Sequence, residues 1–337
     1  MDKQEALRLP TMGTESASYE EILAQADEAY ESMGVSDLYS TGIAGLDRYM
    51  SGGFGRRGSY EMVVISSAPK KFKTTVAMRM MVENLKNKVP MLWFLEEMSY
   101  AETLNTIRGF FYPNIHEADK LFEQAIGKSL FILKKETIKN IQTIEQAQAL
   151  IELWRANKNI ELVYIDPFNY LTADASQGDQ RQNNINDFNM LRKLQAFLEK
   201  NKMTALLVAH NTKDSTKHRQ EGLAGSAYIA RMATKIIETR TEGRVILTDD
   251  AGIEHTHLLL SFEMWSARGV NSWEFMPYVL DVEFNPSHKG VKIQELPDSV
   301  LCAAAHLLHP DAIDRKQREL YPPLRKAFED LAECSSD

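Results

Sequence analysis

Short apolar runs alternate with amphipathic segments along the middle of the chain. The apolar runs have the length of strands and lie at residues 60–65, 91–95, 130–133, 161–165 and 204–209. The amphipathic segments have helical spacing and lie at residues 75–85, 101–110, 143–154 and 187–200. Nearly continuous apolar strands between amphipathic helices are typical of a parallel sheet covered on both faces, so the pattern predicts an α/β fold.

The pattern changes towards both ends of the chain. After residue 234 come β-rich runs at 235–239, 244–248, 257–263 and 278–284, which predict an antiparallel extension of the sheet. Residues 19–33 predict one short amphipathic helix, which either folds back on the body or docks on a neighbouring subunit. We expect a flexible N-terminus with this linker helix at 1–37, the α/β domain at 38–296, and a helical tail at 297–337.

Composition narrows the class of protein. With 337 residues, of which 44% are hydrophobic, the chain can form one large domain with appendages. No apolar run approaches the roughly 20 residues of a membrane span, and the N-terminus lacks an apolar signal core, so we expect a cytoplasmic protein. Cys302 and Cys334 fit neither a disulfide framework nor a zinc cluster. A net charge of -8 disfavours a broad basic surface but allows a local basic loop.

Residues 66–75 lie between a strand-like run and a helix-like run, where a phosphate-binding P-loop belongs. The usual pattern is G-x-x-x-x-G-K-[ST], in which backbone N–H groups and the lysine hold phosphates and the hydroxyl binds Mg²⁺. Lys73 and Thr74 fit, but Ser67 and Phe72 replace the glycines. Phe suits positive φ poorly, so the turn either strains Phe72 or avoids positive φ. The candidate nucleotide-binding residues are Ser67, Ala68, Pro69, Lys70, Lys71, Phe72, Lys73, Thr74 and Thr75.

Carboxylates follow two of the buried runs. Asp166 ends the run that begins at residue 161 and, with Thr74, is the candidate Mg²⁺ ligand. Glu96 and Glu97 follow the run at 91–95, where one of them would orient the attacking water. A solvated strand end is the alternative explanation for the two glutamates.

Two polar segments, at residues 172–184 and 211–225, follow strands at the edge where an open parallel sheet carries its ligands. His210 stands just before the second segment, where it would sense the γ-phosphate and signal its loss. That segment carries four basic side chains suited to a phosphodiester backbone, with a solvated charge run as the alternative. They are Lys213, Lys217, His218 and Arg219. Arg268 is a candidate for an arginine that acts across a subunit boundary.

Several segments, in this order along the chain, resemble the DnaB-type and Twinkle-like ring helicases of the RecA-like ATPase superfamily. They are residues 40–47 with Gly52-Gly53, the P-loop segment, and residues 94–99, 165–170, 208–210 and 225–227, and the resemblance spans roughly residues 38 to 285. It implies a RecA-like P-loop ATPase core of phage or mobile-element type. It further implies that the protein uses ATP or another NTP with Mg²⁺ and forms a hexameric ring that moves on single-stranded DNA during replication.

The resemblance also implies individual roles. Lys73 and Thr74 match the P-loop lysine and hydroxyl, Asp166 the Walker B aspartate, His210 the γ-phosphate sensor and Arg268 the arginine finger. For the catalytic glutamate, counting back from Met98 selects Glu97, whereas the Leu-Glu step selects Glu96; we favour Glu97. In this family the helix before the ATPase domain docks on the next subunit. We expect a separate primase, loader or polymerase as partner.

Two other functions remain open at this point. The Phe-Lys-Thr form of the P-loop resembles variants in phage RecA-like proteins, which favours a recombinase that forms filaments on DNA. Ser266 stands where the family commonly has a lysine before the finger. The altered P-loop is also compatible with an ATP-binding replication accessory that does not hydrolyse ATP.

Overall fold

The computed structural model of this protein describes residues 37–43, 46–47, 50, 52–67, 72–141, 143–168, 180–210, 232–248, 252, 254–267, 276–285 and 290–295. The chain divides into two compact units, Met1–Asp37 and Leu38–Asp337, and the elements below belong to the second. The predicted helix at 19–33, the polar segment at 211–225 and the predicted tail lie outside the described residues. Within the described part, no helix is both long and apolar enough to cross a membrane.

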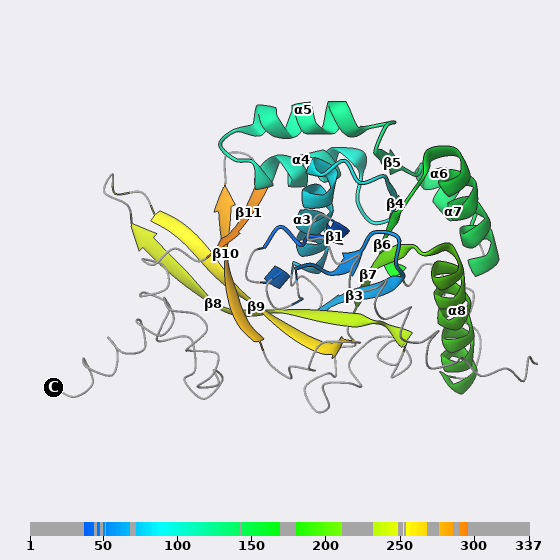
Figure 1. Cartoon of the computed structure of the whole chain (residues 1–337). Helices are drawn as coiled ribbons and strands as arrows, with labels where there is room; N and C mark the ends of the chain where they lie inside the picture. Colours follow the sequence, from blue (N-terminus) through cyan, green and yellow to red (C-terminus); the bar gives the residue numbers. More distant parts are fainter. Residues whose placement is uncertain are drawn as a thin grey trace, which may run out of the picture. The chain divides into compact units, whose positions relative to one another are not determined.

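Nine strands form one sheet in the order β11-β10-β9-β8-β3-β7-β6-β4-β5 (Figure 1). Six neighbours in this order, from β8 to β5, are parallel. They are β8 (Lys235–Thr248), β3 (Glu61–Ser67), β7 (Thr204–His210), β6 (Leu162–Asp166), β4 (Met91–Leu95) and β5 (Leu130–Ile132). The five apolar runs of the sequence are all strands here, so the predicted parallel sheet is confirmed.

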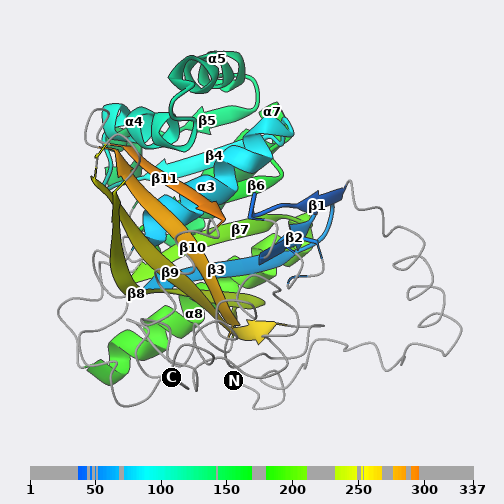
Figure 2. The same ribbon diagram turned by 90° about the vertical axis from the view of Figure 1, so that its left-hand side faces the viewer.

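The antiparallel extension is confirmed as well, with two corrections. It consists of β8, β9 (Glu254–Ala267), β10 (Met276–Asn285) and β11 (Gly290–Glu295), each antiparallel to the next. The runs predicted as separate strands at 235–239 and 244–248 form the single strand β8, because its pairing with β9 continues across a register shift between Thr241 and Gly243. Strand β11 was not predicted; it lies beside helix α4 (Figure 2).

Helices cover both faces of the parallel sheet. One face carries α3 (Lys73–Lys86), α4 (Tyr100–Phe110) and α5 (Ile115–Ala125), and the other carries α6 (Lys135–Lys139), α7 (Ile144–Lys158) and α8 (Gln180–Asn201). Helices α5 and α6 were not predicted, since α5 buries only two alanines and α6 is a single turn. The prediction of a loop up to residue 184 was wrong from residue 180 onward, because the polar start of α8 carries no apolar period.

Each central strand contributes to two separate cores. In β3, Val63 and Ile65 pack on the side of α3, whereas Met62 and Val64 pack on the side of α8. All four side chains are buried. This alternation follows from the two-residue period of a strand, and it leaves neither face of β3 in contact with solvent.

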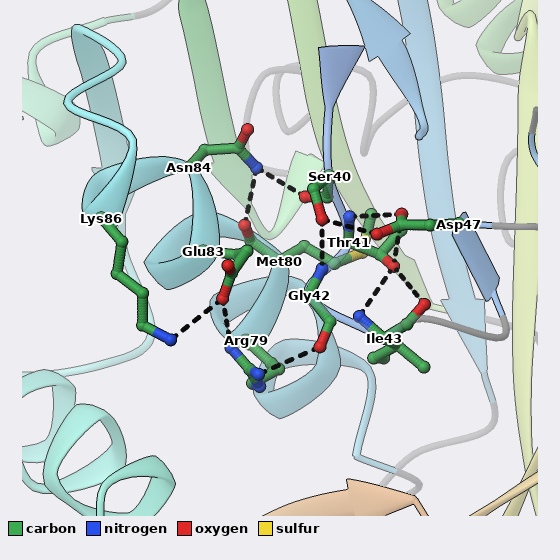
Figure 3. A network of polar contacts seen from close by, with 10 residues as sticks. All are labelled: Ser40, Thr41, Gly42, Ile43, Asp47, Arg79, Met80, Glu83, Asn84 and Lys86. Carbon is green, nitrogen blue, oxygen red and sulfur yellow. Dashed lines mark hydrogen bonds and ion pairs between the residues drawn. The ribbon is translucent and has the colours of Figure 1, made fainter. Parts of the chain in front are cut away.

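Asp47 organises the loop that leads into the domain. One of its carboxylate oxygens, Oδ1, accepts hydrogen bonds from the backbone N–H and the hydroxyl of Thr41, both at 2.7 Å. The other oxygen accepts one from the Ser40 hydroxyl at 2.5 Å (Figure 3). A single carboxylate thus holds the turn closed.

The same loop is fastened to α3. The side-chain amide of Asn84 donates to the Ser40 carbonyl at 2.7 Å, and Arg79 donates to the Gly42 carbonyl at 3.0 Å (Figure 3). Gly42 has a φ of +69°, and a Cβ there would lie 2.9 Å from Glu83 Cβ. The small and polar residues of this segment therefore serve to anchor the helix that begins at Lys73.

We expect Asp47→Ala to lower the free energy of unfolding by about 2 to 4 kcal/mol, because three hydrogen bonds to a charged acceptor are lost. Asp119→Ala is the matched control: its carboxylate also receives two hydrogen bonds, from Arg108, but in an exposed pair. That variant should lose about 1 kcal/mol or less. Urea denaturation measures both, and equal losses would contradict the anchoring role of Asp47.

Candidate functional site

The predicted site residues come from segments far apart in the chain and meet at one edge of the sheet. Ser67, at the end of β3, is paired in register with His210 at the end of β7. Asp166, at the end of β6, is paired with Leu95 at the end of β4. The Glu96 N–H donates to the Asp166 carbonyl at 3.1 Å, which extends this contact past the strand. This is the carboxyl edge of the parallel strands, where open sheets of this type bind ligands.

Helix α3 begins at this edge, shortly after β3 ends. Its N-cap residue, Phe72, provides no side-chain hydrogen bond, and its first turn contains no acidic residue. The first N–H groups of a helix need acceptors from outside the helix, and they form the positive end of its dipole. Thr74 and Thr75 lie half-buried in this turn. The turn therefore offers donors and positive potential to an anion such as a phosphate.

Phe72 adopts the left-handed conformation, with φ of 62° and ψ of 12°. Of the two backbone paths that the sequence leaves open, the strained one is therefore present. Its ring is partly buried against the core on the α3 side of the sheet. A left-handed residue with a Cβ costs about 1–2 kcal/mol, and ring burial opposes this cost.

Lys73 is 6% exposed at the start of α3. Burial lowers the pKa of its ammonium group, and the negative charges of Asp166 and Glu97 oppose that shift. A cation in such a position is poorly hydrated and acts through a low dielectric, which strengthens its attraction for an anion.

Asp166 is 2% exposed, and its two carboxylate oxygens differ. Oδ2 accepts a hydrogen bond of 2.8 Å from the Tyr164 hydroxyl, whereas Oδ1 is buried without a hydrogen-bond partner among the described residues. Burial raises the pKa of this carboxyl, and hydrogen bonds from Tyr164 and Thr74 oppose the rise. An unpartnered buried carboxylate oxygen close to a threonine hydroxyl is a suitable ligand pair for Mg²⁺, which prefers oxygen.

The number of protein ligands also fits Mg²⁺. Within the described ranges there is no group of three or more His, Cys, Asp or Glu side chains that would hold a metal ion by themselves. Mg²⁺ at nucleotide sites is bound by one or two protein groups, with water and phosphate oxygens completing its shell. Thr74 and Asp166 are such a pair.

The two candidate glutamates differ in their surroundings. Glu97 is exposed, and its charge raises the pKa of Asp166, of Lys73 and of the buried Tyr164. Glu96 is half-buried and contributes its backbone N–H to the pairing with β6. The carboxylate that acts electrostatically on the site is thus that of Glu97.

The remaining predicted site residues lie outside the described residues, and their roles stay predictions. They are Ala68, Pro69, Lys70, Lys71, Lys213, Lys217, His218, Arg219 and Arg268. For His210 the backbone of the strand is described but the side chain is not. Sequence reasoning missed Tyr164; the available signal was its position two residues before Asp166, which places both side chains on one face of β6.

Comparison with known proteins supports the fold. No family model matches the chain, and none of the curated proteins matches it in sequence. Solved structures do match, among them the ATPase domain of a DnaB-like helicase, with a TM-score of 0.59 and 14% sequence identity. The match covers 83% of this chain and 100% of that chain. The domain therefore has the fold of a RecA-like P-loop ATPase.

We expect Phe72→Gly to be more stable than Phe72→Ala by about 1 kcal/mol, because both lose the ring but only glycine relieves the left-handed strain. The order should reverse at Glu152, an exposed position inside α7, where alanine exceeds glycine by about 1 kcal/mol. Denaturation of the four variants gives both differences. An alanine variant at residue 72 that equals or exceeds the glycine variant would refute the strain.

Proposed function

We propose that this protein is an ATP-driven translocase and helicase of the DnaB/Twinkle type, acting as an oligomeric ring on single-stranded DNA in replication. The observation that carries the proposal is the meeting of Lys73, Asp166 and Glu97 at the carboxyl edge of the sheet, beside the first turn of α3. Each of these groups perturbs the pKa of at least one other, and such coupled groups are typical of functional sites.

In this proposal Lys73 and the first-turn N–H groups of α3 hold the phosphates of ATP. Lys73 is well placed for this because its side chain is almost completely removed from water. Thr74 and Asp166 hold Mg²⁺, which neutralises phosphate charge when it is bound. Burial of the ligands excludes competing water and keeps the electrostatic interactions strong.

Glu97 orients the attacking water and receives its proton. An exposed carboxylate can approach a water molecule, and Glu97 acts electrostatically on the residues that hold the phosphate and the metal. Glu96 supports this role from the backbone, since its N–H ties the end of β4 to the end of β6. We therefore assign the general base to Glu97.

Strand β7 links the nucleotide site to the proposed DNA-binding loop. It lies between β3 and β6, and its last residue, His210, is level with Ser67. In the proposal His210 senses the γ-phosphate and changes the position of the basic segment at 211–225. Lysine and arginine side chains there would bind the DNA backbone through its phosphates.

The position of β9 supports an arginine finger that acts on a neighbouring subunit. Its last residue, Ala267, pairs with Lys235, which is level with Val63 on β3. Val63 lies four residues before Ser67, about 13 Å along the strand at roughly 3.3 Å per residue. Arg268 follows Ala267 directly, so we propose that it serves the nucleotide of the next subunit.

A filament-forming recombinase is the second candidate, favoured by the Phe-Lys-Thr sequence and the left-handed Phe72 that accompanies it. Electron microscopy with single-stranded DNA and a non-hydrolysable ATP analogue separates the two. Closed rings are expected for the helicase, and open helical filaments would favour the recombinase.

We expect single-stranded DNA to stimulate ATP hydrolysis, with a stimulation that falls as salt is raised. Lys73→Ala should lose ATP binding and hydrolysis together, because the phosphates lose their buried cation. Lys86→Ala is the control: this lysine lies at the other end of α3, where it pairs with Glu83, and the variant should hydrolyse ATP normally. Steady-state ATPase assays with and without DNA measure all three proteins.

Two results would reject the leading proposal. Hydrolysis that depends on neither DNA nor Lys73 would show that the activity comes from elsewhere. Nucleotide binding that requires Lys73 but leads to no hydrolysis under any DNA condition would identify the protein as an ATP-binding accessory.

We expect Glu97→Gln to lower kcat by about 10²- to 10⁴-fold, the usual contribution of a general base. Nucleotide affinity should be retained, since the glutamine is isosteric. Glu96→Gln is the adjacent control and should leave kcat unchanged, because its contribution is through the backbone N–H. Single-turnover hydrolysis distinguishes the two variants, and a larger loss in Glu96→Gln would reverse the assignment.

A further inference from the structure

Tyr164 has a single polar atom in a fully buried side chain, and that atom contacts Asp166. The residue is 0% exposed in the middle of β6, and its hydroxyl donates to Asp166 Oδ2 at 2.8 Å. A phenylalanine would fill the same space without a buried hydroxyl. The hydroxyl therefore has a specific partner, and that partner is the proposed metal ligand.

The ring of Tyr164 is held from the neighbouring strand. Trp93 on β4 is its partner in the parallel register, and the two rings pack edge to face with centroids 5.6 Å apart and an interplanar angle of 82°. Trp93 is also completely buried. Tight packing on this side restricts the ring of Tyr164, so the direction of its hydroxyl is fixed by the core rather than by solvent.

The fixed hydroxyl determines how the Asp166 carboxylate is oriented. A carboxylate can rotate about its last bond and exchange its two oxygens, but a hydrogen bond to Oδ2 selects one orientation. In that orientation Oδ1 is buried and has no hydrogen-bond partner among the described residues. A buried oxygen without a partner is unfavourable, and a bound cation would remove this cost.

We propose that Tyr164 is a positioning residue that holds Asp166 with Oδ1 presented to a divalent cation. The inference rests on the proposed nucleotide site, but it goes beyond it, because it assigns a function to a buried core residue outside the loop. Tyr164 touches neither nucleotide nor metal in this role; it acts through Asp166. Residues that orient a metal ligand typically change metal affinity by about 10- to 100-fold when they are removed.

The test compares Tyr164→Phe with the native protein. Isothermal titration with a non-hydrolysable ATP analogue is carried out over a range of Mg²⁺ concentrations and in EDTA. We expect the variant to need about 10- to 100-fold more Mg²⁺ for half-maximal enhancement of nucleotide binding. Its affinity for the nucleotide in EDTA should equal that of the native protein, because Lys73 and the first turn of α3 are unchanged.

Trp93→Phe is the matched control. It disturbs the packing of the same core but leaves the Tyr164 hydroxyl in place, so its Mg²⁺ requirement should remain native even if its stability falls. Tyr164→Leu provides a second variant without the hydroxyl and should show the same raised Mg²⁺ requirement as Tyr164→Phe. Denaturation curves for each protein separate stability from metal binding.

Three outcomes would overturn the inference. They are an unchanged Mg²⁺ requirement in Tyr164→Phe, an equal loss of binding with and without Mg²⁺, and failure of both Tyr164 variants to fold, since the hydroxyl would then be needed for the core alone. A native protein that binds no nucleotide under any condition would instead reject the proposed function. The two failures are therefore distinguishable.

Discussion

The register of four parallel strands is the constraint on which the rest of the structure depends. Strands β3, β7, β6 and β4 are buried on both faces, so a shift of one residue would exchange the two cores and bury the wrong side chains. The same register sets where the strands end. Ser67, Asp166 and the backbone of Glu96 are brought to one edge by apolar packing far from any charged group. Chemistry at the edge is thus a consequence of order in the core.

Unfavourable local features are concentrated at that edge. Lys73 and Asp166 are both nearly removed from water, Phe72 is in the left-handed region, and Oδ1 of Asp166 lacks a partner among the described residues. Elsewhere in the described part of the domain, strongly buried charges are paired; Lys235, for example, bonds the Phe54 carbonyl and lies 3.6 Å from Glu61. Strain and incomplete pairing persist only where the surroundings are rigid, and they are expected where a ligand supplies the missing interaction.

The sequence predicted what depends on apolar period and missed what does not. Long apolar runs identified the parallel strands and the helices between them, because burial on both faces requires continuous apolar residues. Helix α6, strand β11 and the first turns of α8 were missed, since they are short or polar and owe their form to their neighbours. Within the site, Lys73, Asp166 and Glu97 were accessible from their places after strands. Tyr164 was not, because a tyrosine in a buried strand has the pattern of an ordinary core residue.

Phe72 shows what the glycine of a P-loop contributes. The pattern rule names a glycine because it adopts positive φ without steric cost, yet the backbone here takes that conformation with a phenylalanine. The ring is packed against the α3 core, so burial of apolar surface offsets the strain that glycine would avoid. The requirement is therefore on the backbone angle at the start of the helix, and a side chain can meet it when the adjacent core has room for its ring. A search for this type of site by its glycines alone would pass over such a chain, whereas the order of strand, loop, buried lysine and second-strand aspartate identifies it.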